Sequence, residues 1–377
     1  MGTLLIRPPG HRRDVALRPA ATAMVWIGEG HAHETIAVPG VALGDHDALV
    51  AVEMSTVCAS DVRTVLGQAP SPTPLVLGHE SIGRVIAIGD AGVTAVDGGP
   101  LRIGDRVVWS ATVSCDACDR CLAGLTQKCR TLGAYGRDRI GIHGDLTGAF
   151  STHMQLRAGT RIVRVPESLP AAVLSPASCA TATAWAAVSR AARDHDLDGA
   201  VVRIYGAGLV GLSAAAIAVE QGALVEMVDP DPVRLAWASR FGARHHRVEH
   251  DLDSPDASTG ADVAPVVVIE TSGCAAAKAI DSVAAGGIVV LAGEYLPASV
   301  LGLDAESLVS RLVTVVGLRG CTGTDLAEAV AFLAGRGRAY PFAEAVGDVR
   351  SLAEIDEAIA AASAPGAPLR IGLVPGR

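Results

Sequence analysis

Four cysteines lie within fifteen residues of this chain, and their spacing is the feature that most restricts the fold. Cys115, Cys118, Cys121 and Cys129 follow the pattern C-x2-C-x2-C-x7-C. Four thiolates at short, fixed spacing can bind one Zn²⁺ tetrahedrally and leave no open coordination position. Such a site holds a loop in place and performs no chemistry. A disulfide-rich loop is the alternative, but the chain is long and has only eight cysteines, which favours the metal site.

Composition excludes several classes of protein. The 377 residues are enough for two domains with cores of their own. The net charge of −9 argues against a nucleic-acid-binding surface. No stretch approaches about 18 uninterrupted apolar residues, so we expect no membrane span. The first twenty residues contain no apolar run of signal-peptide length, and cysteines used as thiolates suit a reducing compartment, so we expect a cytoplasmic protein.

The hydrophobic pattern changes near residue 180. Before it, apolar stretches such as Ala48–Met54, Ser81–Ile88 and Arg106–Trp109 are separated by Gly, Pro and Asp, which is typical of a β-rich domain. After it, strand-like runs alternate with Ala-rich stretches, which predicts a parallel, doubly wound sheet. The expected strands are Ala200–Tyr205, Leu224–Val228, Pro265–Glu270, Gly287–Leu291 and Leu312–Val316, the expected helices are Ser213–Gln221 and Pro232–Phe241, and a last strand is expected at Arg370–Val374.

A glycine-rich segment in the second half is typical of dinucleotide binding. Residues 206–211 read Gly-Ala-Gly-Leu-Val-Gly, directly after an expected strand and at the start of an expected helix. Gly206 would allow the tight turn, Gly208 would let the backbone approach the pyrophosphate, and Gly211 would let helix and strand pack closely. Leu209 and Val210 open the helix, whose free N–H groups would face the phosphates.

Asp229 favours NAD over NADP. It ends the strand after the glycine-rich segment, where its carboxylate is placed to accept hydrogen bonds from the adenosine ribose. A carboxylate there would repel a 2′-phosphate, and Asp231 adds to this field. No arginine follows immediately; Arg234 lies a turn further on, and we include it among the expected cofactor-binding residues. The alternative is that Asp229 only caps the following helix.

Three residues far apart in the sequence form a second candidate metal set. They are Cys58, His79 and Cys179. Each is weak alone, because a buried cysteine is usually a small hydrophobic residue and a single histidine is usually structural. Together, two sulfurs, one imidazole and one open position are the coordination of the catalytic zinc in alcohol dehydrogenase.

These motifs, in this order, resemble the zinc-dependent medium-chain dehydrogenase/reductase family of the alcohol dehydrogenase type. The matching motifs are CASD, GHE, the four-cysteine lobe, CATATAW, GAGLVG and PLR, and the resemblance covers roughly residues 21–377. It implies an α/β protein with a GroES-like β-rich catalytic domain and a Rossmann doubly wound parallel sheet. The expected boundaries are an N-terminal arm at 1–20, the catalytic domain at 21–182 with its lobe at about 112–132, the Rossmann domain at 183–334, and a return to the catalytic domain at 335–377.

The resemblance also implies metal ligands. Cys58, His79 and Cys179 match the catalytic zinc ligands, and the four lobe cysteines match the structural zinc ligands, which gives two Zn²⁺ per subunit. Asp61 matches the carboxylate that orients the ligand histidine. Glu80 matches a carboxylate behind the metal that can transiently approach it.

Further residues match groups that handle the proton and the cofactor. Ser60 matches the hydroxyl that takes the substrate proton. Thr183 matches a residue near the nicotinamide, and Arg370 matches an arginine near the cofactor phosphates. Many relatives carry a histidine, which passes the proton to solvent, where this chain has Arg63. Because a guanidinium does not titrate at working pH, the route of the proton beyond Ser60 is left open.

The implied reaction is hydride transfer between NAD and an alcohol, or its aldehyde or ketone. A finer resemblance to a subgroup associated with phosphonate metabolism, and to dehydrogenases of alicyclic alcohols, leaves the substrate open between these classes. The alternatives are a non-catalytic cofactor-binding protein and a zinc-free double-bond reductase of the same superfamily; the complete ligand sets argue against both. The family also implies a homodimer or homotetramer.

Overall fold

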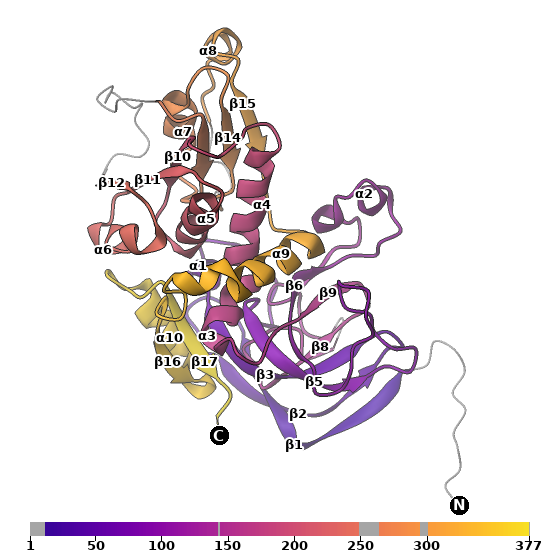
Figure 1. Ribbon diagram of the computed structural model, residues 1–377. Helices are drawn as coiled ribbons and strands as arrows, with labels where there is room; N and C mark the ends of the chain where they lie inside the picture. The colour runs from indigo at the N-terminus through magenta and orange to yellow at the C-terminus, as the bar shows by residue number, and fades with distance from the viewer. Residues whose placement is uncertain (1–11, 142–143, 249–263, 295–300, 377) are drawn as a thin grey trace, which may run out of the picture.

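The structure is a computed structural model that describes residues 12–141, 144–248, 264–294 and 301–376. Its two sheet-based parts lie one above the other in Figure 1. The lower part contains a curled, mostly antiparallel sheet, and the upper part contains a parallel sheet flanked by helices. This arrangement confirms the predicted fold class.

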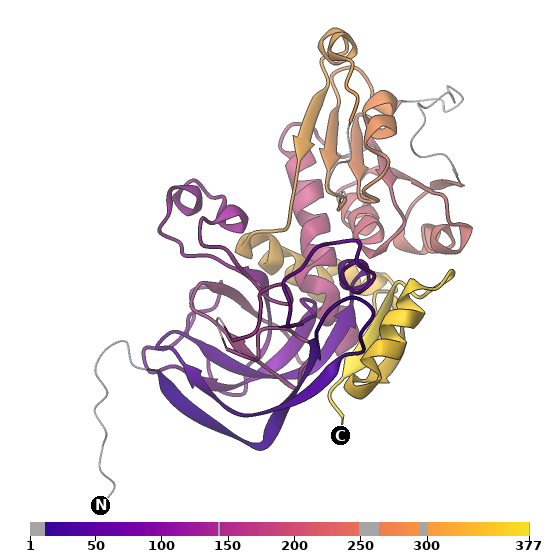
Figure 2. The same cartoon turned by 180° about the vertical axis from the view of Figure 1, so that it is seen from behind.

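The curled sheet combines strands from both ends of the chain. In spatial order it contains β16 (Val346–Ser351), β17 (Arg370–Val374), β3 (Ala48–Val57), β5 (Ser81–Ile88), β6 (Arg106–Val113) and β7 (Gly133–Ala134), with β8 (His153–Leu156) on β3 and β9 (Thr160–Arg164) on β6. β17 pairs antiparallel with β3, so the end of the chain returns to the first sheet. Figure 2 shows these yellow C-terminal elements beside the indigo strands. A smaller sheet, β2 (Glu34–Leu43), β1 (Arg13–Trp26) and β4 (Leu75–Val76), shares an apolar cluster with it.

The parallel sheet contains the point where strand order reverses. Its spatial order is β12 (His245–Val248), β11 (Leu224–Asp229), β10 (Val201–Tyr205), β13 (Val267–Glu270), β14 (Ile288–Leu291) and β15 (Thr314–Gly317). The chain moves outward from β10 through β11 to β12 and then returns to β13 on the other side of β10. In such open sheets, ligands bind at the carboxyl ends of the strands beside this reversal.

One long helix joins the two parts. The helices are α1 (Ala59–Val65), α2 (Asp119–Leu122), α3 (Ala171–Leu174), α4 (Ala180–Ala192), α5 (Leu209–Glu220), α6 (Pro232–Leu235), α7 (Ala276–Ser282), α8 (Ala305–Ser310), α9 (Gly323–Ala334) and α10 (Ile355–Ser363). The small, buried Ala184, Ala187 and Ala191 let α4 pack closely in the core. The same apolar cluster contains Ile82 of the curled sheet and Ile204 of the parallel sheet, so the core is continuous between the two parts.

The length and apolarity of the helices bear on whether the chain can cross a membrane. Among the described residues, no single helix is long and apolar enough to cross a membrane. One pair, Ala171–Ser178 with Ala180–Ala192, reaches the required length and apolarity only when the two are joined, and it is bent by 57°.

Part of the expected N-terminal arm, residues 1–20, belongs to a strand. Strand β1 begins at Arg13, and Arg13–Ala16 pair with Gly40–Leu43 of β2. Pro19 interrupts the apolar pattern, and the register shifts between Ala16 and Ala21. Because of this interruption, the alternation of apolar and polar residues that predicts a strand cannot be recognised here from the sequence. Residues 1–11 of the arm lie outside the described residues.

The expected helix at Pro232–Phe241 is a shorter helix followed by a tight turn. Helix α6 ends at Leu235, and a 3₁₀ turn covers Ser239–Phe241. Phe241 is fully buried against Tyr340 and Phe342, which come from a distant segment. Contacts of this kind lie beyond what the local helical period can predict.

Candidate active site and metal centres

The four lobe cysteines converge on one point. Their sulfurs lie within 4.8 Å of one another. The Sγ–Sγ distance is 3.5 Å between Cys118 and Cys121, and 4.0 Å between Cys115 and Cys121. A tetrahedral site with Zn–S bonds of about 2.3 Å needs sulfurs about 3.8 Å apart. The four cysteines are free of disulfides. The set therefore fits one Zn²⁺ held without an open position.

Backbone N–H groups of the lobe point at these sulfurs. The N–H of Cys115 donates to Sγ of Cys129 at 3.3 Å, and the N–H of Cys118 donates to Sγ of Cys115 at 3.4 Å. The first of these bonds lowers the pKa of Cys129 to about 6. This contact favours the thiolate of Cys129, which is the form that binds metal, whereas burial raises the pKa of Cys121 to about 12.

A second set of ligand atoms gathers between the two parts of the molecule. Cys58 precedes α1, His79 lies between β4 and β5, and Cys179 precedes α4. Their ligand atoms and a carboxylate oxygen of Glu80 lie within 4.8 Å of one another. Two sulfurs and an imidazole from three separate segments fit a catalytic zinc site, which keeps one position for substrate.

Asp61 holds two of these ligands in place. Its Oδ2 accepts the backbone N–H of Cys58 at 2.9 Å, which fixes the start of α1. Its Oδ1 lies 3.5 Å from Nδ1 of His79, and this ring nitrogen is buried without a closer hydrogen-bond partner. Asp61 is only 2% exposed. A buried carboxylate behind one ring nitrogen leaves the other as the ligand atom, as the resemblance implies for this residue.

Arg370 lies behind the same cluster. Its guanidinium donates two hydrogen bonds to the Glu80 carboxylate, at 2.7 and 2.8 Å, and approaches Sγ of Cys58 at 3.7 Å. Thr56 donates a further hydrogen bond to Glu80 at 2.7 Å. The structure thus places Arg370 against the metal cluster through Glu80. Thr56 was not identified from the sequence, because its only signal is that it lies two residues before Cys58.

The protonation of the cluster follows from these contacts. A hydrogen bond from the Cys179 thiol, and the positive charge of Arg370, hold the pKa of Cys58 well below its usual value although burial opposes this. Burial raises the pKa of Glu80, and Arg370 partly offsets that rise. The same hydrogen bond raises the pKa of Cys179 well above its usual value, so the two sulfurs are shifted in opposite directions.

Ser60 and Thr183 lie close in sequence to the metal ligands. Ser60 is in the first turn of α1, two residues after Cys58, and is 7% exposed. Thr183 lies one turn along α4 from Cys179, and its N–H donates to the Cys179 carbonyl at 3.0 Å. Because residues four apart share a helix face, Thr183 and Cys179 lie on the same side of α4.

The glycine-rich segment has the geometry of a phosphate-binding loop. Gly206 follows β10 with φ of 100°, a conformation that favours glycine. A side chain at Gly211 would collide with the Gly206 carbonyl, so strand and helix are in close contact there. Gly208 is the N-cap of α5, and Leu209 and Val210 form its first turn. The amino end of α5 therefore lies beside the strand-order reversal.

Asp229 already contacts this loop. Its carboxylate accepts the N–H of Ala207 at 2.6 Å and the N–H of Asp231 at 2.8 Å. Asp231, and not Asp229, caps α6 by accepting the N–H of Val233 at 2.8 Å. Arg234 is half-exposed and lies 3.6 Å from Asp231. Since each carboxylate oxygen can accept more than one hydrogen bond, Asp229 retains the capacity to bind a ribose hydroxyl.

Glu294 is a residue of the site that the sequence reasoning missed. It lies beyond the carboxyl end of β14, and its backbone carbonyl accepts a hydrogen bond from Arg63 at 2.9 Å. Its carboxylate lies between Arg63 and Arg137. Glu294 follows an expected parallel strand, as Asp229 does, and this position could have identified it from the sequence as a site residue.

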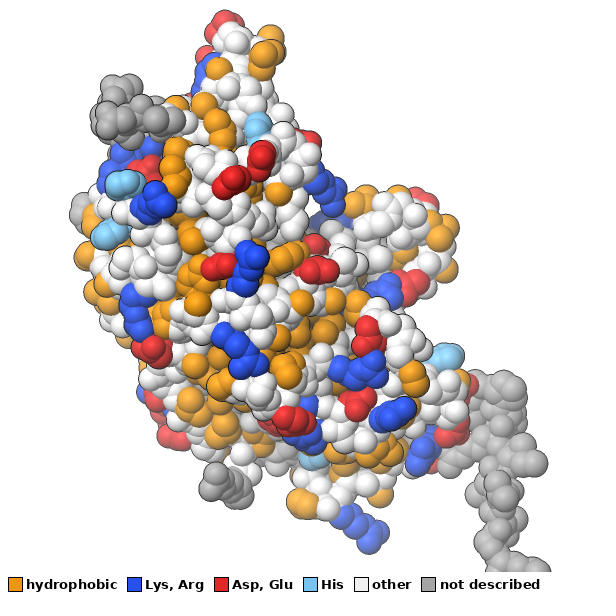
Figure 3. Space-filling model, in the orientation of Figure 1, with side chains coloured by type: hydrophobic (Ala, Val, Ile, Leu, Met, Phe, Trp, Pro, Cys, Tyr) orange, Lys and Arg blue, Asp and Glu red, His pale blue; other side chains and the backbone are white. Residues whose placement is uncertain are grey.

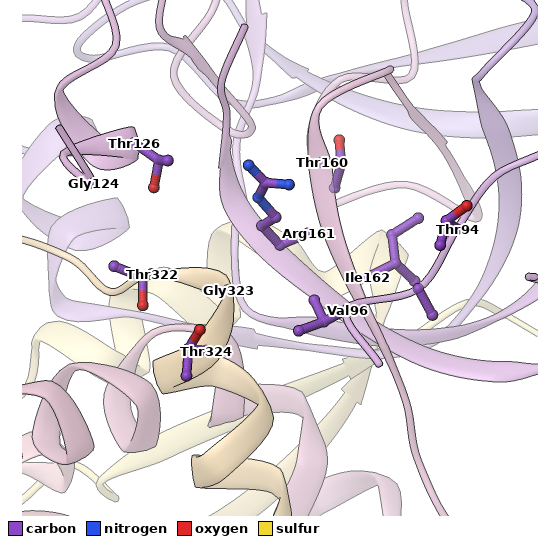
Figure 4. Close-up of a pocket in the computed structure, with 11 residues that line it drawn as sticks. Thr94, Val96, Gly124, Thr126, Thr160, Arg161, Ile162, Thr322, Gly323 and Thr324 are labelled. Atoms are coloured by element: carbon purple, nitrogen blue, oxygen red, sulfur yellow. The ribbon is translucent and has the colours of Figure 1, made fainter. Parts of the chain in front are cut away.

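One cavity lies apart from the ligand atoms of both sulfur clusters. It has a volume of about 460 Å³ and is lined by the lobe, β9 and the start of α9, including Thr126, Arg161 and Thr322 (Figure 4). None of Cys58, His79 and Cys179 lines it.

Figure 3 shows the lobe projecting beside the upper part, and on this face the Lys and Arg side chains are scattered among acidic and apolar ones.

Comparisons with known proteins agree with this geometry. Residues 44–167 match the alcohol dehydrogenase GroES-like domain. An L-threonine 3-dehydrogenase from Chelativorans sp. is 31% identical over 296 residues, which covers 75% of this chain and 79% of that protein. The crystal structure of an alcohol dehydrogenase from Thermotoga maritima has a TM-score of 0.85 at 25% identity, covering 94% of this chain and 99% of that one. A zinc-binding dehydrogenase from Sinorhizobium meliloti, bound to NADP, has a TM-score of 0.79 at 22% identity, with 94% and 99% covered.

Identity of 31% to the Chelativorans protein over 75% of this chain shows a common family, and the two sulfur clusters and the two-part fold of this chain agree with that family. This chain belongs to the zinc-dependent medium-chain dehydrogenase/reductase family.

Proposed function

We propose that the protein is a zinc-dependent oxidoreductase that transfers a hydride between NAD and an alcohol, or its aldehyde or ketone. The observation that carries the proposal is the Cys58–His79–Cys179 cluster with its Glu80 neighbour. Arg63, on the helix that Cys58 begins, contacts Glu294 at the carboxyl edge of the parallel sheet. This contact brings α1, whose first turn follows Cys58, to the edge of the sheet at which a dinucleotide would bind.

Each residue of the cluster has a distinct part in this proposal. Cys58, His79 and Cys179 hold the catalytic Zn²⁺, and the chemistry that it supplies is Lewis-acid activation of the alcohol oxygen. Ser60 accepts the proton from the alcohol as it passes its own hydroxyl proton on toward solvent. Asp61 orients His79. Glu80, held by Arg370, lies close enough to approach the metal.

The lobe cysteines hold a second, structural Zn²⁺ in this proposal. Its support is the set of sulfur separations near those of a tetrahedral site. A closed site of this kind stabilises the lobe and leaves no position for substrate.

NAD is the proposed cofactor, bound by the glycine-rich loop and Asp229. Gly206, Gly208 and the first turn of α5 receive the pyrophosphate, and Asp229 receives the adenosine ribose. The nicotinamide lies toward Thr183. The Sinorhizobium protein binds NADP, but at 22% identity it is informative about the fold alone. The negative charge of Asp229 and Asp231 is what favours NAD.

The substrate is an alcohol whose class is open between several candidates. The sequence favours a phosphonate-bearing or an alicyclic alcohol, and the Chelativorans relative is named for a small hydroxy amino acid.

We further propose a cytoplasmic homodimer or homotetramer. Sedimentation that gives only the monomer mass at micromolar concentration would contradict the oligomer.

The test combines metal analysis with turnover. Purified protein is assayed for zinc per chain and for NADH formation with primary, alicyclic, phosphonate-bearing and hydroxy amino acid alcohols. Two zinc ions per chain and turnover of one class support the proposal. NADH binding without turnover of any alcohol would favour a non-catalytic cofactor-binding protein. Reduction of a conjugated double bond that survives removal of all zinc would favour the zinc-free reductase.

A further inference from the structure

Two arginines from different segments converge on one carboxylate. Nη1 of Arg63 on α1 lies 3.6 Å from one oxygen of Glu294, and Nη2 of Arg137 lies 3.4 Å from the other. The three side chains are 28%, 39% and 33% exposed, so solvent and small solutes reach them. With two positive charges and one negative charge, this group carries a net charge of +1.

Both arginines are tied to segments that carry metal ligands. Arg63 is five residues after Cys58 on α1, roughly 7 Å along the helix axis. Arg137 follows Gly136, where a side chain would come within 2.5 Å of the Gly78 carbonyl oxygen, so this segment lies directly against the residue before His79. Both arginines are therefore anchored in segments that adjoin ligands of the candidate zinc site.

The geometry already accommodates an anionic oxygen group. Each oxygen of the Glu294 carboxylate faces a different guanidinium, which is how a carboxylate or phosphonate would be received. The distances of 3.4 and 3.6 Å are longer than those of strong charge-assisted bonds, which are about 2.7–2.9 Å. Arg63 also holds the Glu294 backbone carbonyl at 2.9 Å, so the segment stays anchored when the side chain moves aside.

We propose that Arg63 and Arg137 form an anion-binding subsite for the substrate, and that Glu294 occupies it when substrate is absent. This inference rests on the proposed dehydrogenase function. It names the substrate class as a short alcohol that carries a carboxylate or phosphonate a few bonds from its hydroxyl carbon. The alcohol end faces the Cys58, His79 and Cys179 cluster, and the anionic end displaces Glu294 from the two guanidiniums.

Binding of an anion that cannot react tests the subsite separately from catalysis. Calorimetry measures the Kd of ethylphosphonate, and of propanoate, for zinc-loaded protein and its variants. Loss of a charge-assisted contact in Arg63→Gln or Arg137→Gln weakens binding by about tenfold or more. Glu294→Gln tightens binding several-fold, a gain that misfolding cannot produce. The control Arg139→Gln, at an exposed arginine two residues from Arg137, leaves the Kd unchanged.

The outcomes separate the possible sources of the anion and of failure. The anion whose Kd rises more in the two arginine variants, ethylphosphonate or propanoate, carries the preferred anionic group. If NADH affinity falls in Arg63→Gln as much as ethylphosphonate affinity does, the pair serves the cofactor and the proposal is wrong. Equal Kd values in all variants also overturn it. Variant-dependent ethylphosphonate binding without turnover of any alcohol would instead leave the subsite standing and refute the dehydrogenase function.

Discussion

The two sulfur clusters differ in how the chain brings them together. The lobe cysteines lie within one stretch of fifteen residues, and the lobe projects from the body (Figure 1). Cys58, His79 and Cys179 span 122 positions and meet only where both sheets and α4 pack together. The lobe offers sulfur alone, whereas the second cluster adds an imidazole, a buried carboxylate and an arginine.

This difference indicates a division of labour. A closed set of four thiolates needs only local geometry, and it can stabilise a loop at the surface. A site that is to activate a substrate needs an open position and charged neighbours held in low dielectric, which only the packed interior supplies. The comparison therefore predicts opposite consequences for damage at the two clusters.

The largest expected effect separates chemistry from stability. Cys179→Ala should reduce turnover to background while the circular dichroism spectrum and the lobe zinc remain, because it removes a ligand of the open site alone. Cys129→Ser should mainly lower thermal stability or oligomer assembly and leave residual turnover in the folded fraction. Zinc content should fall from two to one per chain in each. If Cys129→Ser abolished turnover in fully folded protein, the division of labour would be refuted.

The next effect concerns the ion pairs beside each cluster. Glu80 and Arg370 are 0% and 8% exposed, and Glu80→Gln leaves the guanidinium without its counter-charge. We expect a loss of about 3–5 kcal/mol in the free energy of unfolding. The matched control is Arg130→Gln in the lobe, whose pair with Asp119 is 58% and 62% exposed. Because that pair is exposed and screened by solvent, its loss should be much smaller. Chemical denaturation measures both, and equal losses would contradict the comparison.

A smaller effect is expected at the proton acceptor. Ser60→Ala should lower kcat by about 10²-fold or more, the range for losing a general acid–base group. Arg63→Gln should mostly raise a KM, because the guanidinium stays charged and only donates hydrogen bonds. Steady-state kinetics with varied NAD and varied alcohol distinguish the two. If Ser60→Ala kept a nearly wild-type kcat while Arg63→Gln lost the chemical step, the roles assigned to the two residues would have to be exchanged.

The smallest expected effect tests another local motif. Asp229→Ser removes the charge that disfavours a 2′-phosphate, so the ratio of kcat/KM for NAD over NADP should fall by about tenfold, as for loss of one charged contact. Because Asp229 also accepts the Ala207 N–H, a modest loss of thermal stability should accompany it. The idea fails if wild-type protein already prefers NADP at low cofactor concentration.

Local sequence determined those features whose residues are close together in the chain. The four-cysteine spacing predicted the lobe cluster, and the strand–glycine–helix order predicted the loop at Gly206–Gly211 with Asp229 beside it. The alternation of strands and Ala-rich helices predicted the parallel sheet, because buried parallel strands and their covering helices each have a local signal. The ligand chemistry of Cys58, His79 and Cys179, together with the family resemblance, and not their spacing, predicted that these residues form one site.

Tertiary structure decided what depends on distant segments. Arg370 was expected near cofactor phosphates, and the fold places its guanidinium on Glu80, because β17 pairs with β3 just before Cys58. Glu294 meets Arg63 and Arg137 only because the edge of the parallel sheet faces α1. The hydrophobic periodicity of the sequence cannot predict this contact, because charged side chains at strand ends follow no apolar pattern. The sequence by itself determines which residue types can bind the metal. The packing of distant segments determines which charged side chains surround them.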